Sequence, residues 1–324
     1  MKTRDLGRSG LALTELGFGG GAIGNLYRVV PGEDAMAAMQ TAWDAGIRYF
    51  DTAPFYGHGL SERRIGDFLR DRTGWTLSTK VGKLLVPVPR EAVPDHGFVD
   101  PLPFAVHYDY SGPGIRRSVE ASFARLGLSR IDMLWVHDLE PRTHGSDYQL
   151  HLAEFLKSGL KALEELKADG VIRAYGLGVN EVAPCLSVLD AGNIDAILMA
   201  GRYTLLDRTA EAQLLPLCRD RNVALVIGGV FNSGILATGA RDGAVFDYGP
   251  ASAEVLDRVR RLEAEAGAAG VPLAAAALQF PLREHLVSSV LIGTGRSASM
   301  TRNLASMDVE VPAAFWHAAQ NGSI

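Results

Sequence analysis

Cysteine is scarce in this sequence, which contains two in 324 residues, Cys185 and Cys218. Two cysteines at this separation form neither a disulfide framework nor a CxxC motif, so we expect both to be buried free thiols. No run of about 18 uncharged apolar residues occurs, so no membrane span is predicted. The opening segment MKTRDLGRSG lacks the apolar core of a signal peptide. Together these absences predict a cytoplasmic protein.

An excess of charge of one sign is also missing, since 32 basic and 37 acidic residues give a net charge of −5. This balance gives no support for a nucleic-acid-binding surface. With 47% hydrophobic and 21% charged residues, the composition argues against disordered, collagen-like and coiled-coil proteins. No linker rich in proline, glycine or serine divides the chain, so residues 1–324 are expected to form a single domain.

Short apolar runs alternate with amphipathic stretches along the chain. The expected strands are Leu16–Phe18, Ile47–Asp51, Thr76–Lys80, Ile131–His137, Val171–Gly178, Ala196–Met199, Val223–Ile227 and Val287–Ile292. The expected helices include Glu33–Ala45, Glu62–Arg70, Gly114–Leu126, Phe155–Asp169 and Ala210–Arg221. Short, mostly apolar strands are typical of a parallel sheet that is buried on both faces. Eight strands that alternate with helices predict an α/β fold, a (β/α)8 TIM barrel.

Two segments interrupt this alternation. Lys83–Pro113 contains six prolines and has no helical period, and His137–His151 is polar and rich in histidine and aspartate. In a barrel they follow the third and fourth strands, so we expect them over the C-terminal mouth, where long loops shape a substrate pocket. Insertions that serve only packing remain the alternative. A further mouth loop is expected after the seventh strand.

Charged side chains end three of the expected strands. They are Asp51, Lys80 and His137, and Tyr56 lies in the loop after Asp51. Because polar residues at the C-terminal ends of barrel strands point into the mouth, we expect these four side chains around one opening. A nearby ammonium stabilises a phenolate and lowers the tyrosine pKa. Tyr56 would then exchange a proton with a carbonyl or alcohol oxygen that His137 orients, while a cofactor carries hydride.

The segment Gly19–Gly24 satisfies the pattern G-x-G-x-x-G of Rossmann dinucleotide sites. In those sites the glycines open a helix directly. Here Asn25–Val30 intervene before a helix that is expected to begin near Pro31. We therefore predict no Rossmann site, and expect the glycines, Gly20 among them, to let the chain pass close beneath a ligand.

Four motifs carry a resemblance to a known family, the aldo-keto reductases. They are Asp51–Gly57 (DTAPFYG), Ser61–Glu62, Thr79–Lys80 and Val136–Asp138 (VHD), and the resemblance runs in order from Leu6 to about Asn303. It implies a TIM barrel that binds NAD(P)(H) across its mouth without a Rossmann domain. It also implies that Tyr56 is the general acid/base, tuned by Lys80 and Asp51, and that His137 orients the substrate.

The resemblance also implies cofactor contacts. Asn180 matches the residue that binds the nicotinamide carboxamide, and Tyr203 matches the aromatic residue that stacks on the nicotinamide. Two usual contacts are replaced, a serine by Val179 and a glutamine by Ala200. The other implied contacts are Gly20; Val230, Phe231, Asn232, Ser233, Gly234 and Leu236 in a pyrophosphate loop; and Gly293, Thr294, Arg296 and Asn303, up to a helix that ends near Asn303.

NADP-specific members of this family commonly carry lysine and arginine where this sequence has Gly293 and Ser299. Selecting the 2′-phosphate of NADP requires positive charge, preferably an arginine. Arg296 is left to supply it. We therefore expect NAD to be preferred, with NADP possible.

Within the family, the segments Asp100–Phe104 and His107–Ser111 most resemble members that oxidise the anomeric carbon of an aldose, such as L-fucose, L-galactose or D-arabinose, to a lactone. Two redox alternatives stay open, namely a pyridoxal 4-dehydrogenase, whose substrate is also a hemiacetal, and an NADPH-dependent general aldehyde reductase. Two further alternatives are a Schiff-base aldolase that uses Lys80 and a redox-silent binding protein.

Polar and aromatic residues of the mouth segments are the candidates for binding such a substrate. The expected contacts are His58, Trp135, Asp138 and Tyr108, with His107 and Asp109 as further candidates. No metal site is expected, because His137, His144 and His151 are seven residues apart and no HxxxH or CxxC motif supports one. The expected partner is a small-molecule sugar or aldehyde rather than nucleic acid or a membrane, and the protein is expected to be a monomer or weak homo-oligomer.

Overall fold

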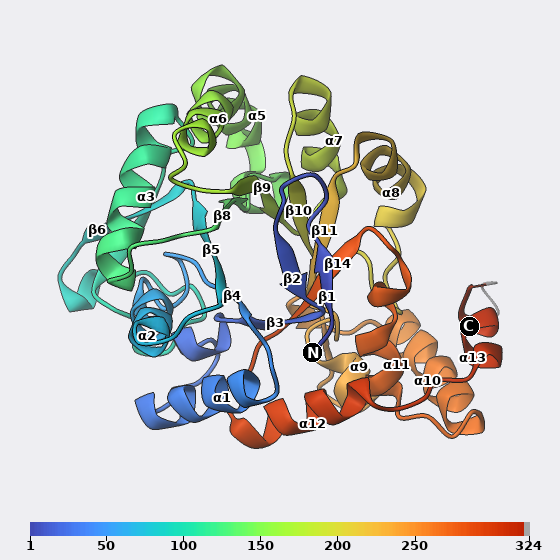
Figure 1. The fold of residues 1–324 in the computed structure, drawn as a ribbon. Coiled ribbons are helices and arrows are strands. Elements are labelled where there is room, and N and C mark those ends of the chain that lie inside the picture. The colour runs from blue at the N-terminus through green and yellow to red at the C-terminus, as the bar shows by residue number, and fades with distance from the viewer. Residues whose placement is uncertain (321–324) are drawn as a thin grey trace.

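Eight parallel strands close into a barrel at the centre of the molecule, and helices surround it (Figure 1). The computed structural model describes residues 1–320. Around the barrel the strands are β3 (Leu16–Gly19), β4 (Tyr49–Asp51), β5 (Thr76–Val81), β8 (Met133–His137), β9 (Ala174–Val179), β10 (Ala196–Ala200), β11 (Ala224–Gly228) and β14 (Val287–Ile292), which pairs with β3. The predicted TIM barrel and its eight strands are confirmed.

The outer helices are α1 (Gly32–Asp44), α2 (Leu60–Leu69), α3 (Gly112–Leu126), α6 (Leu160–Ala168), α7 (Val182–Ala191), α8 (Ala210–Arg221), α10 (Ala253–Ala268), α11 (Leu273–Gln279), α12 (Ser297–Met307) and α13 (Ala313–Gln320). Among them, α1, α2, α3, α6 and α8 agree with predicted ones apart from shifts at their ends, whereas α7, α10, α11 and α13 were not predicted. A π-helical turn at Phe155–Gly159 precedes α6. The prediction that the last-strand helix ends near Asn303 is wrong, because Leu304 and Met307 extend the apolar face that packs on the core.

Two apolar clusters hold the barrel together. The larger one lies between the strands and the outer helices. The smaller one includes Trp135 from β8, together with Leu6 and Leu13 from the N-terminal hairpin of β1 (Thr3–Asp5) and β2 (Ala12–Thr14). This hairpin lies across the N-terminal end of the barrel (Figure 1). The mouth is therefore at the opposite end, where the strands finish.

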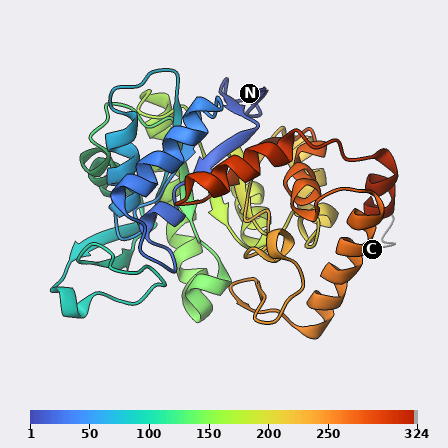
Figure 2. The same ribbon diagram turned by 90° about the horizontal axis from the view of Figure 1, so that it is seen from below.

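Three insertions gather on the side of the barrel opposite the N-terminus (Figure 2). They are the antiparallel pair β6 (Lys83–Pro87) and β7 (Phe104–Tyr108), the short helices α4 (Pro141–His144) and α5 (Tyr148–Glu154), and α9 (Ile235–Thr238) with the hairpin β12 (Val245–Phe246) and β13 (Gly249–Pro250). The sequence analysis identified these segments but assigned no elements to them. Their strands are only partly buried, so they lack the continuous apolar pattern that marks the barrel strands.

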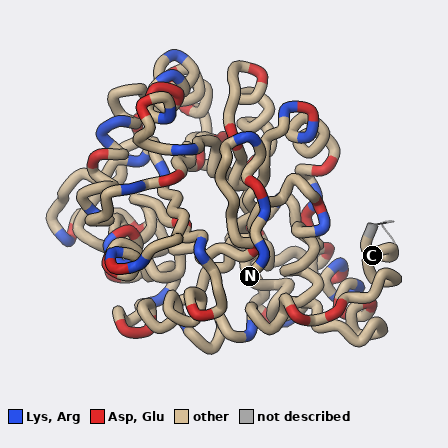
Figure 3. Tube along the Cα trace, in the orientation of Figure 1, with Lys and Arg blue, Asp and Glu red and all other residues tan. Residues whose placement is uncertain are grey.

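The thiols Cys185 and Cys218 are free and buried, as predicted. Basic and acidic residues are interspersed around the molecule (Figure 3). Among residues 1–320, no helix combines the length and apolarity needed to cross a membrane.

Helices α2 and α3 touch at Gly66, where a β-carbon would lie 1.8 Å from the carbonyl oxygen of Leu126. We therefore expect Gly66→Ala to force the helices apart and lower the free energy of unfolding by about 3 kcal/mol. Gly267→Ala in α10 is the matched control, because no atom lies within 4 Å of its β-carbon. Thermal unfolding of both variants checks this: Gly267→Ala should be neutral or stabilising, and equal melting temperatures would contradict the expectation.

Candidate active site

A buried ion pair lies at the C-terminal ends of β4 and β5. Lys80 Nζ donates to Asp51 Oδ2 at 2.6 Å and to the carbonyl oxygen of Thr52 at 2.9 Å. The second carboxylate oxygen of Asp51 accepts a hydrogen bond from Ser78 Oγ, also at 2.6 Å. An ammonium and a carboxylate withdrawn from water need partners of this kind. The position of Lys80 is therefore fixed by both a charge and a backbone carbonyl.

Tyr56 lies beside this pair, in the turn that follows β4. Lys80 Nζ is 4.7 Å from the Tyr56 ring centroid, and the His137 ring stands nearly perpendicular to the phenol with a centroid distance of 5.8 Å. Burial raises the pKa of Tyr56 well above its usual range, and the charges of Asp51 and Asp138 raise it further. The expectation that Lys80 brings the pKa of Tyr56 below its usual value is wrong here, because burial raises this pKa and Asp51 beside the ammonium raises it further. Tyr56 is a neutral phenol that can donate a proton.

His137 ends β8 with its imidazole buried. Burial lowers its pKa well below the usual value; Asp138 opposes this shift, whereas Lys83 and Lys80 add to it. Nε2 lies 3.5 Å from Asp138 Oδ2, and the buried Nδ1 has no hydrogen-bond partner within residues 1–320. The ring is therefore neutral at physiological pH and suited to orienting a hydrogen-bonding group.

The sequence analysis missed a second lysine beside this group. Lys83 Nζ donates to Asp138 Oδ2 and lies 4.0 Å from the centroid of the Phe55 ring. Burial opposes ionisation of Asp138, but His137 and Lys83 together lower its pKa to about 2. The available signal was the spacing, because Lys83 follows Lys80 by three residues at the start of a mouth insertion. Asp138 is thus an ionised acceptor next to the predicted acid/base group.

Asn180, just beyond β9, is held by a buried carboxylate that the sequence analysis also missed. Glu140 Oε2 accepts from the Asn180 backbone N–H at 2.6 Å, and Oε1 accepts from its side-chain Nδ2 at 2.7 Å. The Asn180 carbonyl oxygen accepts from Arg202 Nε at 2.7 Å. No local sequence signal pairs residue 140 with residue 180, because only the barrel brings the ends of β8 and β9 together.

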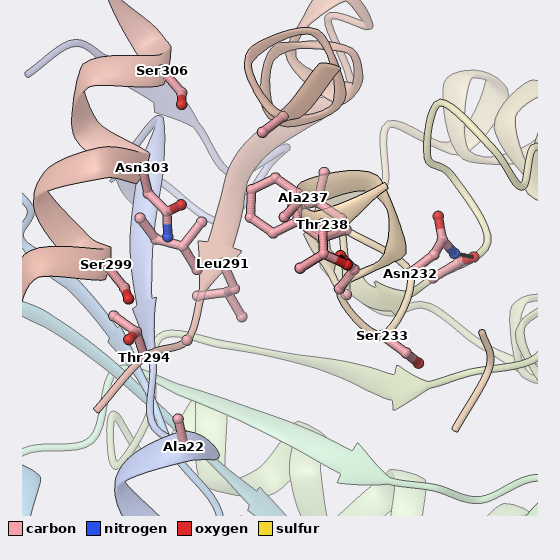
Figure 4. A pocket seen from close by; sticks show the side chains of 18 of the residues that line it. Ala22, Asn232, Ser233, Ala237, Thr238, Leu291, Thr294, Ser299, Asn303 and Ser306 are labelled. Atoms are coloured by element: carbon pink, nitrogen blue, oxygen red, sulfur yellow. Dashed lines mark hydrogen bonds between the residues drawn. The ribbon is translucent and has the colours of Figure 1, made fainter. Parts of the chain in front are cut away.

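A cavity of about 1150 Å³ extends from the loop after β3 to α12. It begins near Ala22 and reaches Ser306, and a β-carbon on the neighbouring Gly21 would lie 4.0 Å from the Tyr56 ring. Figure 4 shows Ser299, Asn303 and Ser306 on α12 facing Thr238 across this space. Eight predicted cofactor residues line it, namely Val230, Phe231, Asn232, Ser233, Gly234, Gly293, Thr294 and Asn303.

The cavity, at about 1150 Å³, has room for a dinucleotide, and the backbone around it fits one. The loop Gly229–Gly234 contains four residues with left-handed backbone, two of them Asn232 and Ser233, which turns the chain sharply around the cavity wall. Gly293 lines the cavity without a side chain. A bare backbone at such places lets a ligand approach closely.

Other predicted cofactor residues lie elsewhere. Tyr203 packs against Phe280 with a centroid distance of 5.3 Å and borders a separate hollow with Glu211 and Arg219. The predicted stacking of Tyr203 on a nicotinamide is therefore wrong, since its ring packs beside α8 and not at the mouth. Asn180, Leu236 and Arg296 do not line the cavity, whereas Arg302 does.

Gly20 has a packing explanation. A β-carbon there would lie 2.5 Å from Ser61 Oγ and 2.9 Å from the carbonyl oxygen of Asp51. Its own N–H donates to that carbonyl oxygen at 2.7 Å. Gly20 therefore lets the chain after β3 lie against the end of β4, and it does not line the cavity.

Two predicted substrate contacts are buried away from any opening. Trp135 is fully buried in the barrel interior, and His58 is fully buried with its Nε2 3.1 Å from His96 Nδ1. The prediction that they contact substrate is wrong, because neither side chain has a free face. Asp138 and Tyr108 are half-buried at the mouth, and Tyr108 packs edge-on against His144.

Comparison with known proteins places these features in a family. The sequence model of the Aldo/keto reductase family matches residues 15–321 of this chain. The chain is 43% identical to a pyridoxal 4-dehydrogenase from Microbacterium luteolum over 97% of this chain and 95% of that protein. It is 42% identical to a D-threo-aldose 1-dehydrogenase from a Pseudomonas species, over 95% and 93%.

A solved structure, an aldo-keto reductase from Bacillus halodurans in its holo form, aligns with a TM-score of 0.78 at 27% identity, covering 99% of this chain and 96% of that one.

Within residues 1–320, no cluster of three or more histidine, cysteine, aspartate or glutamate side chains is arranged to hold a metal ion.

The Asp51–Lys80 pair can be tested by a double-mutant cycle. Removing one partner leaves an uncompensated buried charge, so Lys80→Met and Asp51→Asn should each lower the free energy of unfolding by about 3–5 kcal/mol. The double variant should lose clearly less than the sum of the two. Denaturant unfolding of all four proteins measures this; strictly additive losses would show that the two side chains are not coupled.

Proposed function

Because this chain belongs to the aldo/keto reductase family, we propose that it is an NAD(P)-dependent oxidoreductase that oxidises the hemiacetal carbon of an aldose to a lactone. The observation that carries this proposal is the arrangement of Tyr56, Lys80, Asp51 and neutral His137 around one mouth. In this set Tyr56 is the proton donor and acceptor, the Asp51–Lys80 ion pair lies beside its ring, and His137 is an uncharged hydrogen-bonding group.

The proposed reaction removes a hydride from the anomeric C–H bond and a proton from the anomeric O–H bond. A nicotinamide cofactor, when bound, would supply the hydride acceptor. Ionised Tyr56 takes the hydroxyl proton at its phenol oxygen, and the C–O bond becomes the carbonyl of the lactone. His137 would orient the reacting oxygen. Because burial raises the pKa of Tyr56, its ionised form, and with it the oxidation, is favoured at alkaline pH.

An aldose is favoured as the substrate by the polar groups beside Tyr56. Ionised Asp138 is an acceptor for sugar hydroxyls, and the buried Lys83 next to it stabilises its charge. Of the two relatives, D-threo-aldose 1-dehydrogenase is named for such a substrate.

Pyridoxal is the second candidate substrate, since the similarity to pyridoxal 4-dehydrogenase is equally high. The aromatic side chains of Phe55 and Phe98, 5.4 Å apart edge-to-face near the mouth, favour a flat ring.

An absorbance assay of the reduced cofactor tests the proposal. Purified protein is mixed with NAD or NADP and, separately, with L-fucose, L-galactose, D-arabinose, pyridoxal and simple alcohols. Reduction of NAD by one of the sugars is the expected result. Activity with pyridoxal alone would select the second candidate. Silence with all of these, but oxidation of NADPH by plain aldehydes, would replace the proposal with a general aldehyde reductase.

Tyr56→Phe removes the proposed proton-transfer group and leaves the ring in place. We expect turnover to fall by about two to four orders of magnitude, as is usual when a general acid/base is lost, while binding of NAD stays close to that of the parent protein. Steady-state kinetics and a fluorescence titration measure the two quantities. Turnover at the parent rate would remove Tyr56 from the mechanism.

We propose NAD as the preferred cofactor and NADP as a possible one. The far end of the cavity offers mainly uncharged polar side chains, namely Ser299, Asn303 and Ser306. Arg302 also lines this end, and its Nη2 donates to Ser299 Oγ at 2.9 Å. Because Arg302 borders the cavity and Arg296 does not, Arg302 is the better candidate for binding a 2′-phosphate.

Arg302→Ala should weaken NADP(H) binding about tenfold more than NAD(H) binding, because an arginine–phosphate contact is charge-assisted. Arg296→Ala is the matched control on the same segment and should change neither affinity. Titrations of the four cofactors with each variant measure the difference. If Arg296→Ala weakened NADP(H) binding more than Arg302→Ala does, Arg296 would be the residue that binds the 2′-phosphate.

A further inference from the structure

The Asn180 side chain is unusually constrained for a residue at the rim of a barrel. Its Nδ2 donates to Glu140 at 2.7 Å and lies 3.3 Å from Asp138 Oδ1, so both side-chain N–H groups face carboxylates. Its backbone N–H and C=O are held by Glu140 and Arg202. The amide therefore cannot turn over without placing its oxygen against two carboxylates. Its Oδ1 is directed away from them, where the Tyr248 hydroxyl approaches to 3.4 Å.

Glu140 has no other evident use among the described residues. Its side chain is fully buried, and both carboxylate oxygens are engaged by Asn180. Burying a carboxylate without a cation partner costs free energy. A simple structural fastening at this position would not require a charge, since a neutral hydrogen-bonding side chain or a backbone carbonyl can accept an N–H. The two acceptors on one side chain are what fix the orientation of the Asn180 amide.

We propose that Glu140 is a positioning residue: it holds the Asn180 amide with Oδ1 toward Tyr248, which lines the cavity, so that Oδ1 would accept a hydrogen bond from the carboxamide of a bound nicotinamide. This inference rests on the proposed NAD(P) dependence. Ala200, at the end of the neighbouring strand β10, carries no polar group that could share this task. In the proposed contact, another residue therefore sets the orientation of the Asn180 amide.

The arrangement makes cofactor recognition sensitive to pH. Burial, with the charges of Asp138 and Glu181, raises the pKa of Glu140 to about 7, although the two bonds from Asn180 oppose the shift. The other groups that face this carboxyl are the neutral side chains of Tyr110, Tyr148 and Cys185. The cations close by, Lys83 and Arg202, are paired with Asp138 and with Asp207 and Asp247.

Only the ionised carboxylate accepts both N–H groups, because protonation turns one oxygen into a donor. The nicotinamide contact should therefore weaken as the pH falls through about 7, and the rest of the cofactor contacts should not change with it.

The test compares NAD with ADP-ribose, which lacks the nicotinamide, in direct binding titrations. Glu140→Gln keeps the size of the side chain but offers one acceptor instead of two. We expect it to weaken NAD and NADH binding about tenfold, the usual effect of losing a charge-assisted hydrogen bond, and to leave ADP-ribose binding unchanged. In the parent protein the ratio of the two affinities should fall below about pH 7, whereas in the variant it should be flat.

Asp132→Asn is the matched control. Asp132 is also a buried carboxylate that accepts a backbone N–H, from Leu77 at 2.9 Å, but it lies at the opposite end of β8. This variant should leave the affinity ratio and its pH dependence unchanged.

Equal weakening of NAD and ADP-ribose by Glu140→Gln, or an affinity ratio in the parent protein that does not vary with pH, would overturn the inference and leave the proposed function intact. If the parent protein binds none of NAD(H), NADP(H) and ADP-ribose, the proposed function itself fails.

Discussion

A lysine ammonium buried at the end of a barrel strand is the constraint on which the rest of the site depends. Lys80 can stay there only with Asp51 and the Thr52 carbonyl against it. Asp51 in turn needs Ser78 on the strand next to it. The two strand ends must therefore finish at matching heights, which the parallel register of β4 with β5 provides. Tyr56 is placed by the turn that follows, so the position of the phenol is a consequence of how the charge is satisfied.

The carboxylates around the mouth differ in how many cationic partners they have. Asp51 and Asp138 each have a lysine, and Asp247 has the two arginines Arg142 and Arg202. Glu140 has none among the described residues, and its pKa is raised accordingly. The groups that are neutral at physiological pH, Tyr56 and His137, lie between the paired ones. The charged groups at the mouth are thus held in place by their partners, and the neutral groups are the ones left to hydrogen-bond a ligand.

The sequence predicted those parts of the molecule that follow from one-dimensional rules. The barrel strands are apolar on both faces, and their C-terminal ends meet in any parallel barrel, so the sequence alone places Asp51, Lys80 and His137 together. The sequence does not place residues whose neighbours come from distant segments of the chain. Trp135 is an aromatic residue of the kind that stacks on sugar rings, but it points into the barrel interior beside Leu6 and Leu13. Tyr203 follows a strand end yet folds outward onto Phe280, and Glu140 finds its partner 40 residues away.

The N-terminal hairpin fills the end of the barrel remote from the mouth, and Met1 lies on that face, beside Gly46. The candidate active site and Met1 thus lie at opposite ends of the barrel. A support joined to the first residues, whether a bead, an electrode or a fused carrier, would hold every copy with its opening turned toward the solution. The fold in this way supplies an orientation for immobilised use that would otherwise have to be engineered.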